Sequence, residues 1–236
     1  METGNFDVSD PKQSVFLFLY EFLGTFLLLT AINFSNNNNL IVPCGVFLGV
    51  IIVGKRTGGH FNFGVTMGVY LMKWQPKKHL KALFIYFFAE LLGAFVGMFI
   101  AWCYLSTDGI TVFPPPNVAE YNVFYVMFVE FFFTFCFHSM IMHAKEERVA
   151  IVNDNLVGLL QVMVGMYFAI MCSGGYSGAV LNPSIGIANL AFVAIVQNTS
   201  QYLKFIPAYF FGPLLGGALA GFFAGHVSSR ITPEKR

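Results

Sequence analysis

Two glutamates inside strongly apolar stretches are the residues of this sequence with the clearest chemical potential. Glu21 is followed four residues later by Thr25, and Glu130 by Thr134, so the second pair repeats the first 109 residues further on. A carboxylate inside a membrane is expensive unless it has a partner, and such residues mark either a proton pathway or a structural hydrogen-bond acceptor.

Two asparagines, Asn62 and Asn182, lie 120 residues apart in glycine-rich stretches. Each stretch follows a short apolar segment and is itself apolar enough to enter a membrane, unlike an ordinary loop. Short, glycine-interrupted apolar segments at matching places in two halves of a chain are typical of broken helices that meet at the bilayer midplane. The short segments are 40–56 and 155–172, and the stretches after them are 57–72 and 173–192.

The composition indicates the elements that must position these side chains. Of 236 residues 56% are hydrophobic and 11% charged, whereas a soluble domain has about 25% charged residues. One bilayer crossing takes about 20 apolar residues, so about 132 apolar residues suffice for six crossings. This composition, with a net charge of +1, excludes a soluble enzyme, a disordered chain and a partner that is a nucleic acid. We predict one domain, 1–236, with spans at about 14–34, 40–56, 80–105, 121–143, 155–172 and 202–227.

The basic residues predict the orientation of these spans. With six spans, 12 of the 13 Lys and Arg residues fall on the side of the N-terminus, and only Lys204 falls opposite. The positive-inside rule then places both termini of this multi-pass protein in the cytoplasm or the equivalent interior of an organelle. No cleavable signal or transit peptide is evident, and the kind of membrane stays open.

The two halves form a repeat, at about 14–105 and 121–227. Because each copy has three spans, the second must enter the membrane from the opposite side. On Gly59-His60-Phe61-Asn62, on Ser177-Gly178 leading to Asn182-Pro183, and on the glycine-rich segment 212–221, the sequence resembles the aquaporin (major intrinsic protein) family over essentially its whole length. The resemblance implies an all-α integral membrane fold, an aquaporin-like bundle of six transmembrane helices plus two re-entrant half-helices. It also implies a homotetramer in the lipid bilayer.

The resemblance further implies the roles of individual residues. Asn62 and Asn182 would cap the half-helices and offer their side-chain amides to passing water, where the helix N-termini make a positive centre. Glu21 and Glu130 would support the irregular backbone of the re-entrant loops, and His60 would lie in the vestibule beside the pore mouth. The remaining residues of the predicted pore centre are Phe63, Gly64, Pro183 and Ser184.

Both asparagine motifs depart from the Asn-Pro-Ala of the family. The second reads Asn182-Pro183-Ser184, a mild change, but the first reads Asn62-Phe63-Gly64. Proline at the first helical position is pre-organised for the helix and wastes no donor. We therefore expect a less rigid first half-helix, with a large ring at the place where the two half-helices interlock in the family.

The predicted selectivity filter has changed more. The family arginine stands three residues after the second asparagine, where this chain has Ile185, and spacing from the motifs puts Val42, Ile170 and Ala179 at the other three positions. Such a filter has no charge and no fixed donor. A narrow apolar constriction can dewet and close, whereas a wider one would pass small, less polar neutral solutes while conducting water poorly. Phenylalanines near the pore, at positions 47, 61 and 63, could also fill it.

These observations lead to a function and an alternative to it. We predict an aquaporin-like membrane channel for water or small neutral solutes with an altered, apolar selectivity filter. In the alternative, the pore is inactive and the chain is a structural subunit that packs against non-identical subunits of a larger membrane complex. The sequence contains no HExxH pattern and no nucleophile–base pairing, so we expect no enzyme activity and no catalytic, metal or cofactor site.

Overall fold

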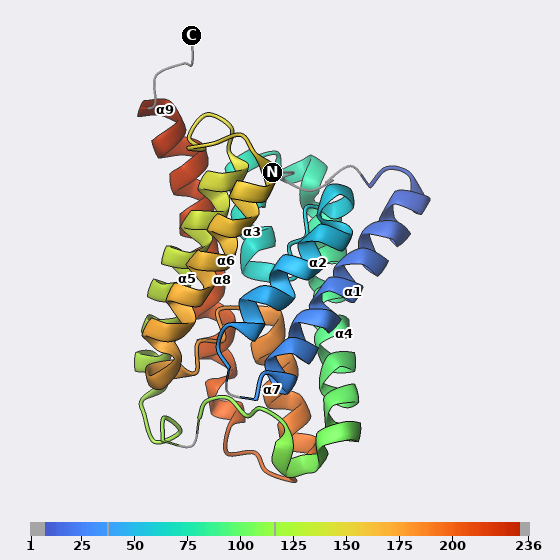
Figure 1. The fold of residues 1–236 in the computed structure, drawn as a ribbon, viewed down its shortest axis with the longest axis vertical. Coiled ribbons are helices and arrows are strands. Elements are labelled where there is room, and N and C mark those ends of the chain that lie inside the picture. The colour runs from blue at the N-terminus through green and yellow to red at the C-terminus, as the bar shows by residue number, and fades with distance from the viewer. Residues whose placement is uncertain (1–7, 37, 116, 232–236) are drawn as a thin grey trace.

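The computed structural model describes residues 8–36, 38–115 and 117–231, and these residues form helices and turns without β-strands. Figure 1 shows that the helices form a bundle. The first helix begins and the last helix ends on the same side of this bundle, which we call the terminal end. Lys235 and Arg236, two of the basic residues from which the orientation was predicted, lie outside the described ranges. The helices are α1 Pro11–Phe34, α2 Ile41–Thr57, α3 Phe63–Lys73, α4 Pro76–Gly109, α5 Val123–Lys145, α6 Asn155–Ser177, α7 Pro183–Val196, η1 Leu203–Phe205, α8 Ile206–Phe222, η2 Phe223–Ser228 and α9 Ser229–Ile231.

The helix lengths confirm the predicted all-α membrane architecture. Four long apolar helices, α1, α4, α5 and α6, and the continuous stretch Leu203–Ile231 are long enough to cross a membrane, while α2 has 17 residues. The short helices α3 and α7, with 11 and 14 residues, lie between the long ones. These two helices occupy the stretches in which the sequence predicts half-helices.

One predicted boundary is wrong. The fifth span was expected to end near residue 172, but α6 continues through Gly174 and Gly175 to Ser177. Glycine weakens a helix without terminating it, and the termination comes at Gly178, whose φ of +91° is the left-handed conformation that glycine adopts readily. Helix α2 ends in the same way at Gly58, also with φ +91°.

A closely packed glycine stripe joins α3 to α8. A Cβ atom at Gly221 would lie 1.9 Å from the carbonyl oxygen of Gly68, and one at Gly217 would lie 2.1 Å from that of Gly64. Small residues let the backbones of membrane helices approach closely. Here they seat the first half-helix directly against the last long helix, and this contact sets its position in the bundle.

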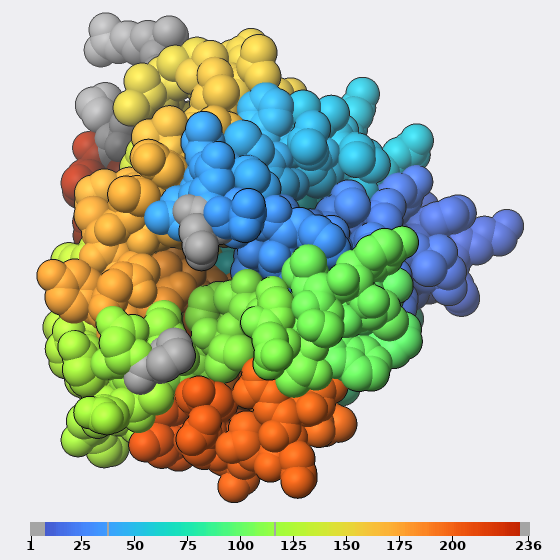
Figure 2. Space-filling view, turned by 60° about the horizontal axis from the view of Figure 1, so that its bottom comes forward, coloured from blue at the N-terminus to red at the C-terminus, as the bar shows by residue number. Residues whose placement is uncertain are grey.

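The segment 110–115 crosses the end of the bundle opposite the termini. The amide N–H groups of Thr111 and Phe113 donate to the side-chain oxygens of Asn33 and Asn189, at 2.9 and 3.1 Å, and the Asn189 Nδ2 donates to the Thr111 carbonyl at 2.7 Å. Figure 2 looks at this end and shows the segment in green between the blue helices α1 and α2 and the orange region near residue 200. Two buried asparagines thus hold an irregular segment over the bundle.

Candidate functional site

The two asparagines determine where the half-helices begin and how they meet. Asn62 Oδ1 accepts from the N–H of Gly64 at 2.9 Å, and Asn182 Oδ1 accepts from Ser184 N–H at 3.0 Å. Asparagine is a preferred N-cap because its oxygen satisfies N–H groups that have no partner within the helix. In addition, Asn62 Nδ2 donates to Leu181 O and Asn182 Nδ2 donates to Phe61 O, both at 2.8 Å. Each asparagine therefore caps its own half-helix and bonds the backbone just before the other.

Glu21 lies behind the loop that leads into α3. Its side chain is fully buried and accepts from the N–H groups of Phe61, at 2.8 Å, and His60, at 3.2 Å, and from the hydroxyl of Thr57. Phe61 has φ +52° and cannot continue a helix. In hydrocarbon, an irregular backbone needs an internal acceptor for each free N–H group, and the Glu21 carboxylate provides it here.

Glu130 has the corresponding contacts in the second half. Its buried carboxylate accepts from Leu181 N–H at 2.7 Å, from Val180 N–H at 3.0 Å and from Ser177 Oγ at 2.6 Å. Leu181 has φ +53°, the counterpart of Phe61. Each of the three hydrogen bonds that the Glu21 carboxylate accepts thus has an equivalent at Glu130.

Two tyrosines that the sequence gave no reason to select hold the ends of α2 and α6. Tyr86 Oη donates to the carbonyl of Thr57, and Tyr209 Oη donates to the carbonyl of Ser177 at 2.5 Å. Both tyrosine side chains are fully buried. They satisfy carbonyl groups at helix C-termini, which have no partner within the helix.

Glu90 breaks the correspondence between the halves. This fully buried residue of α4 accepts from Thr66 Oγ1 at 2.9 Å and from Ser184 Oγ at 3.2 Å. The Thr66 hydroxyl also lies 2.9 Å from His60 Nδ1. One carboxylate therefore joins the first turns of α3 and α7. The sequence analysis identified no partner for Glu90. The signal that could have found its partners is a hydroxyl residue in the first turn after each asparagine, Thr66 after Asn62 and Ser184 after Asn182.

His138 explains the glycine of the first motif. Its imidazole is fully buried, with Nε2 3.3 Å from Asn62 Nδ2. A Cβ at Gly64 would lie 2.8 Å from His138 Cε1, so the alanine of the family motif does not fit beside this ring. The contact also takes the second amide hydrogen of Asn62, whereas Asn182 makes one such donation within the described residues. In the described part of the chain, one amide hydrogen of Asn182 therefore makes no hydrogen bond to the protein.

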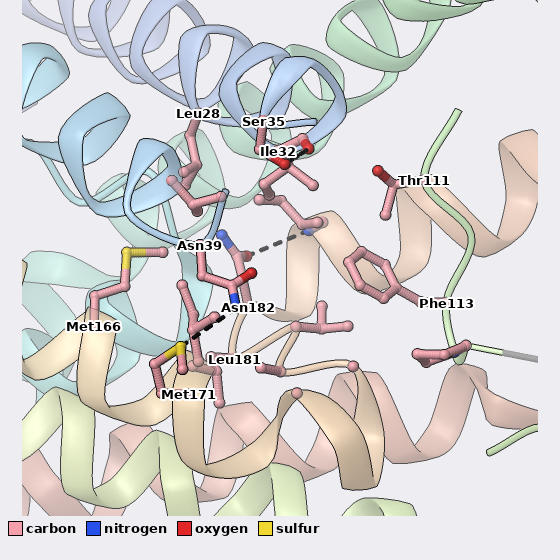
Figure 3. A pocket seen from close by; sticks show the side chains of 18 of the residues that line it. Leu28, Ile32, Ser35, Asn39, Thr111, Phe113, Met166, Met171, Leu181 and Asn182 are labelled. Carbon is pink, nitrogen blue, oxygen red and sulfur yellow. Dashed lines mark hydrogen bonds between the residues drawn. The ribbon is translucent and has the colours of Figure 1, made fainter. Parts of the chain in front are cut away.

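A cavity of about 360 Å³, here the large cavity, opens from the end opposite the termini down to the asparagines. All four predicted filter residues line it together with Asn62 and Asn182. Figure 3 shows Asn182 and Leu181 at its base, with Asn39 beside Met171, whose sulfur accepts from the Asn39 amide at 3.3 Å. The filter side chains are Val42, Ile170, Ala179 and Ile185.

A second cavity of about 30 Å³, here the small cavity, lies toward the terminal end. His60, Gly58 and Lys145 contribute to its lining. A cavity needs about 10–15 Å³ to hold one water molecule, so the small cavity has room for a few. The two cavities have four lining residues in common and meet there: Leu28, Asn62, Phe137 and Met166.

The three phenylalanines considered as pore-filling residues line neither cavity. The Phe61 ring packs against Gly24 and Gly49, where a Cβ at Gly24 would lie 1.8 Å from Phe61 Cε1, and the Phe63 ring packs on Phe87 at a centroid distance of 4.7 Å. Phe47 is likewise absent from the lining of both cavities. Four residues predicted at the pore centre form the first turns of α3 and α7 behind the asparagines and line neither cavity: Phe63, Gly64, Pro183 and Ser184.

Comparisons with known proteins agree on one family. Residues 12–224 match the family model described as Major intrinsic protein. The chain is 25% identical over 238 residues to an aquaglyceroporin of Plasmodium berghei (strain Anka), covering 91% of this chain and 89% of that protein. It is 26% identical over 250 residues to Aquaporin TIP2-3 of Arabidopsis thaliana, covering 96% and 93%. Among solved structures, the X-ray structure of the aquaglyceroporin from Plasmodium falciparum matches with a TM-score of 0.73 and 25% identity, over 91% of this chain and 96% of that one.

Proposed function

We propose, on the premise that this chain belongs to the major intrinsic protein family, that it is a channel for water and small neutral solutes with an apolar outer filter. The family membership, the aquaporin and aquaglyceroporin relatives and the fold make it a multi-pass membrane protein of a channel family. The observation that carries the finer proposal is the lining of the large cavity, in which all four predicted filter side chains accompany both asparagines.

The chemistry of these four side chains determines which solutes pass. Val42, Ile170, Ala179 and Ile185 offer neither a side-chain hydrogen bond nor a charge. A water molecule that passes between such apolar side chains gives up hydrogen bonds to other waters and gains none from these side chains. This loss raises its free energy. A solute with fewer hydrogen bonds to lose, such as ammonia, meets a smaller barrier. We therefore propose a higher ratio of ammonia to water permeability than a filter with an arginine would give.

The proposed assembly follows the family. We propose a homotetramer in the bilayer, with the terminal end in the cytoplasm or an equivalent compartment, as the distribution of basic residues predicts. One surface available to lipid or to a neighbouring subunit lies on α5, where the side chains of Phe124, Phe128 and Phe132 are 72%, 65% and 46% exposed.

Stopped-flow measurements on proteoliposomes test the solute proposal. Vesicles with the protein should exceed empty vesicles in permeability to ammonia, to water and to glycerol, the last included because the Plasmodium relatives carry the name aquaglyceroporin. Ile170→Gln adds an amide donor to the filter wall and should raise the water-to-ammonia ratio. The matched control is Ile195→Gln, a residue 76% exposed on α7 and away from both cavities.

The second candidate is a pore-inactive structural subunit, and the size of the small cavity favours it. About 30 Å³ leaves room for only a few water molecules. Under this alternative, vesicles with the protein would be no more permeable than empty vesicles to all three solutes. The protein extracted from its native membrane in mild detergent would also purify with non-identical subunits. A conducting homotetramer would refute it.

A further inference from the structure

Lys145, the last residue of α5, is a buried cation in the wall of the pore. Its side chain is only 3% exposed, lines the small cavity beside His60 and Asn62, and donates from Nζ to the carbonyl oxygen of Gly58 at 3.0 Å. We infer that Lys145 supplies the fixed positive charge that keeps cations out of this pore, which has no arginine in its outer filter. This inference rests on the proposed function.

The location of the charge supports this role. Among the described residues that line the large cavity none is charged, and Lys145 is the one Lys, Arg, Asp or Glu side chain that lines the small cavity. A solute moving between the terminal end and Asn62 passes through this small cavity. The ammonium therefore acts in the smaller of the two cavities, where little water is present to screen it.

The buried carboxylate of Glu21 interacts with Lys145 from a position outside both cavities. Glu21 is coupled to Lys145 electrostatically. Its oxygens, however, accept from Thr57, His60 and Phe61, and its side chain lines neither cavity. A cation in the small cavity thus meets the ammonium directly and the carboxylate only through the loop between them.

Lys145 also has a structural contact, which the experiment must separate from its charge. The bond to Gly58 O places a cation at the C-terminus of α2, where helix carbonyls attract positive charge. Lys145→Met removes both the bond and the charge. Ile141 lies one turn earlier on the same helix and also lines the small cavity. In Ile141→Glu, the new carboxylate would pair with Lys145 in the favourable Glu-to-Lys i, i+4 arrangement, so the charge is neutralised while lysine remains.

The experiment measures K⁺ flux relative to water permeability in proteoliposomes of the full chain. A unit charge within about 10 Å, at an effective dielectric constant of about 20, changes the rate of a monovalent ion at least tenfold. Lys145→Met and Ile141→Glu should each raise the K⁺-to-water ratio about tenfold or more. Lys145→Arg and the uncharged Ile141→Gln should keep the low ratio.

The outcomes separate this inference from the proposed function. Water-permeable Ile141→Glu vesicles with the K⁺ flux of the wild type would overturn the role of Lys145, even if Lys145→Met failed to fold. An equal rise in Ile141→Glu and Ile141→Gln would also overturn it, because the effect would then follow polarity rather than charge. Wild-type vesicles without permeability to any neutral solute would instead refute the proposed function.

Discussion

The contact between α3 and α8 predicts that one added methyl group at Gly221 disrupts the protein. In Gly221→Ala, the new Cβ would lie 1.9 Å from Gly68 O, about 1.5 Å short of ordinary van der Waals contact. The clashing atom belongs to the backbone, so no side-chain rotation relieves it and the two helices must separate. Overpacking of this kind costs about 1–3 kcal/mol and occasionally more, and we expect the upper end, at about 3 kcal/mol.

Two measurements follow from this cost. A loss of about 3 kcal/mol should lower the Tm in detergent by about 6–12 °C for a chain of this length. A displacement of α3 away from α8 would also shift Asn62, the N-cap of α3, and disturb its 2.8 Å hydrogen bond to Leu181 O. Water permeability per folded protein should therefore fall together with the Tm.

Gly174 provides the matched control for stability. It also lies inside a membrane helix, α6, but a Cβ there would meet nothing within 4 Å. Because alanine favours a helix over glycine by about 1 kcal/mol, Gly174→Ala should keep or slightly raise the Tm. If Gly221→Ala and Gly174→Ala melted alike, the close approach of α3 and α8 would be refuted as the source of stability.

Three further predictions concern the loops and the filter. Glu130→Gln replaces one acceptor oxygen with a donor and should cost about 1.5–3 kcal/mol through the loss of a charge-assisted bond, visible as a lower Tm than that of the exposed control Glu120→Gln. Asn189→Ala removes two of the three side-chain hydrogen bonds that hold the segment 110–115, leaving the one to Asn33, and should speed hydrogen exchange there, unlike Asn153→Ala on the exposed loop before α6; equal exchange would contradict the anchoring. Ile170→Cys should make permeability sensitive to a charged thiol reagent added from one side, while the wild type, whose four cysteines line neither cavity, should be insensitive.

Much of the fold could be predicted because the membrane imposes simple rules. Apolar runs about 20 residues long must be helices, and the predicted spans lie within a few residues of the observed helices, apart from the end of α6. That end was misplaced because Gly174 and Gly175 have no conformational requirement, whereas Gly178, with φ +91°, has one. Sequence alone does not distinguish a tolerated glycine from a required one.

The candidate site was predictable where residues act through their own chemistry. Asparagine at positions 62 and 182 is a good helix cap, and all four filter positions follow from the motif spacing and line one cavity. The contacts of Glu90, His138 and Lys145 were not predictable. Each depends on which face of a long apolar helix turns inward, and these helices are apolar nearly all round.

The crossed hydrogen bonds of the two asparagines determine when, during synthesis of the chain, the site can be completed. The amide of Asn62 donates to a carbonyl 119 residues later, and the amide of Asn182 to one 121 residues earlier. When a ribosome has delivered only the first three spans to the membrane, the first half-helix already has its cap but lacks the backbone group to which that cap is tied. The nascent first half must therefore wait in the bilayer, incomplete, until the second half-helix emerges and closes the pair.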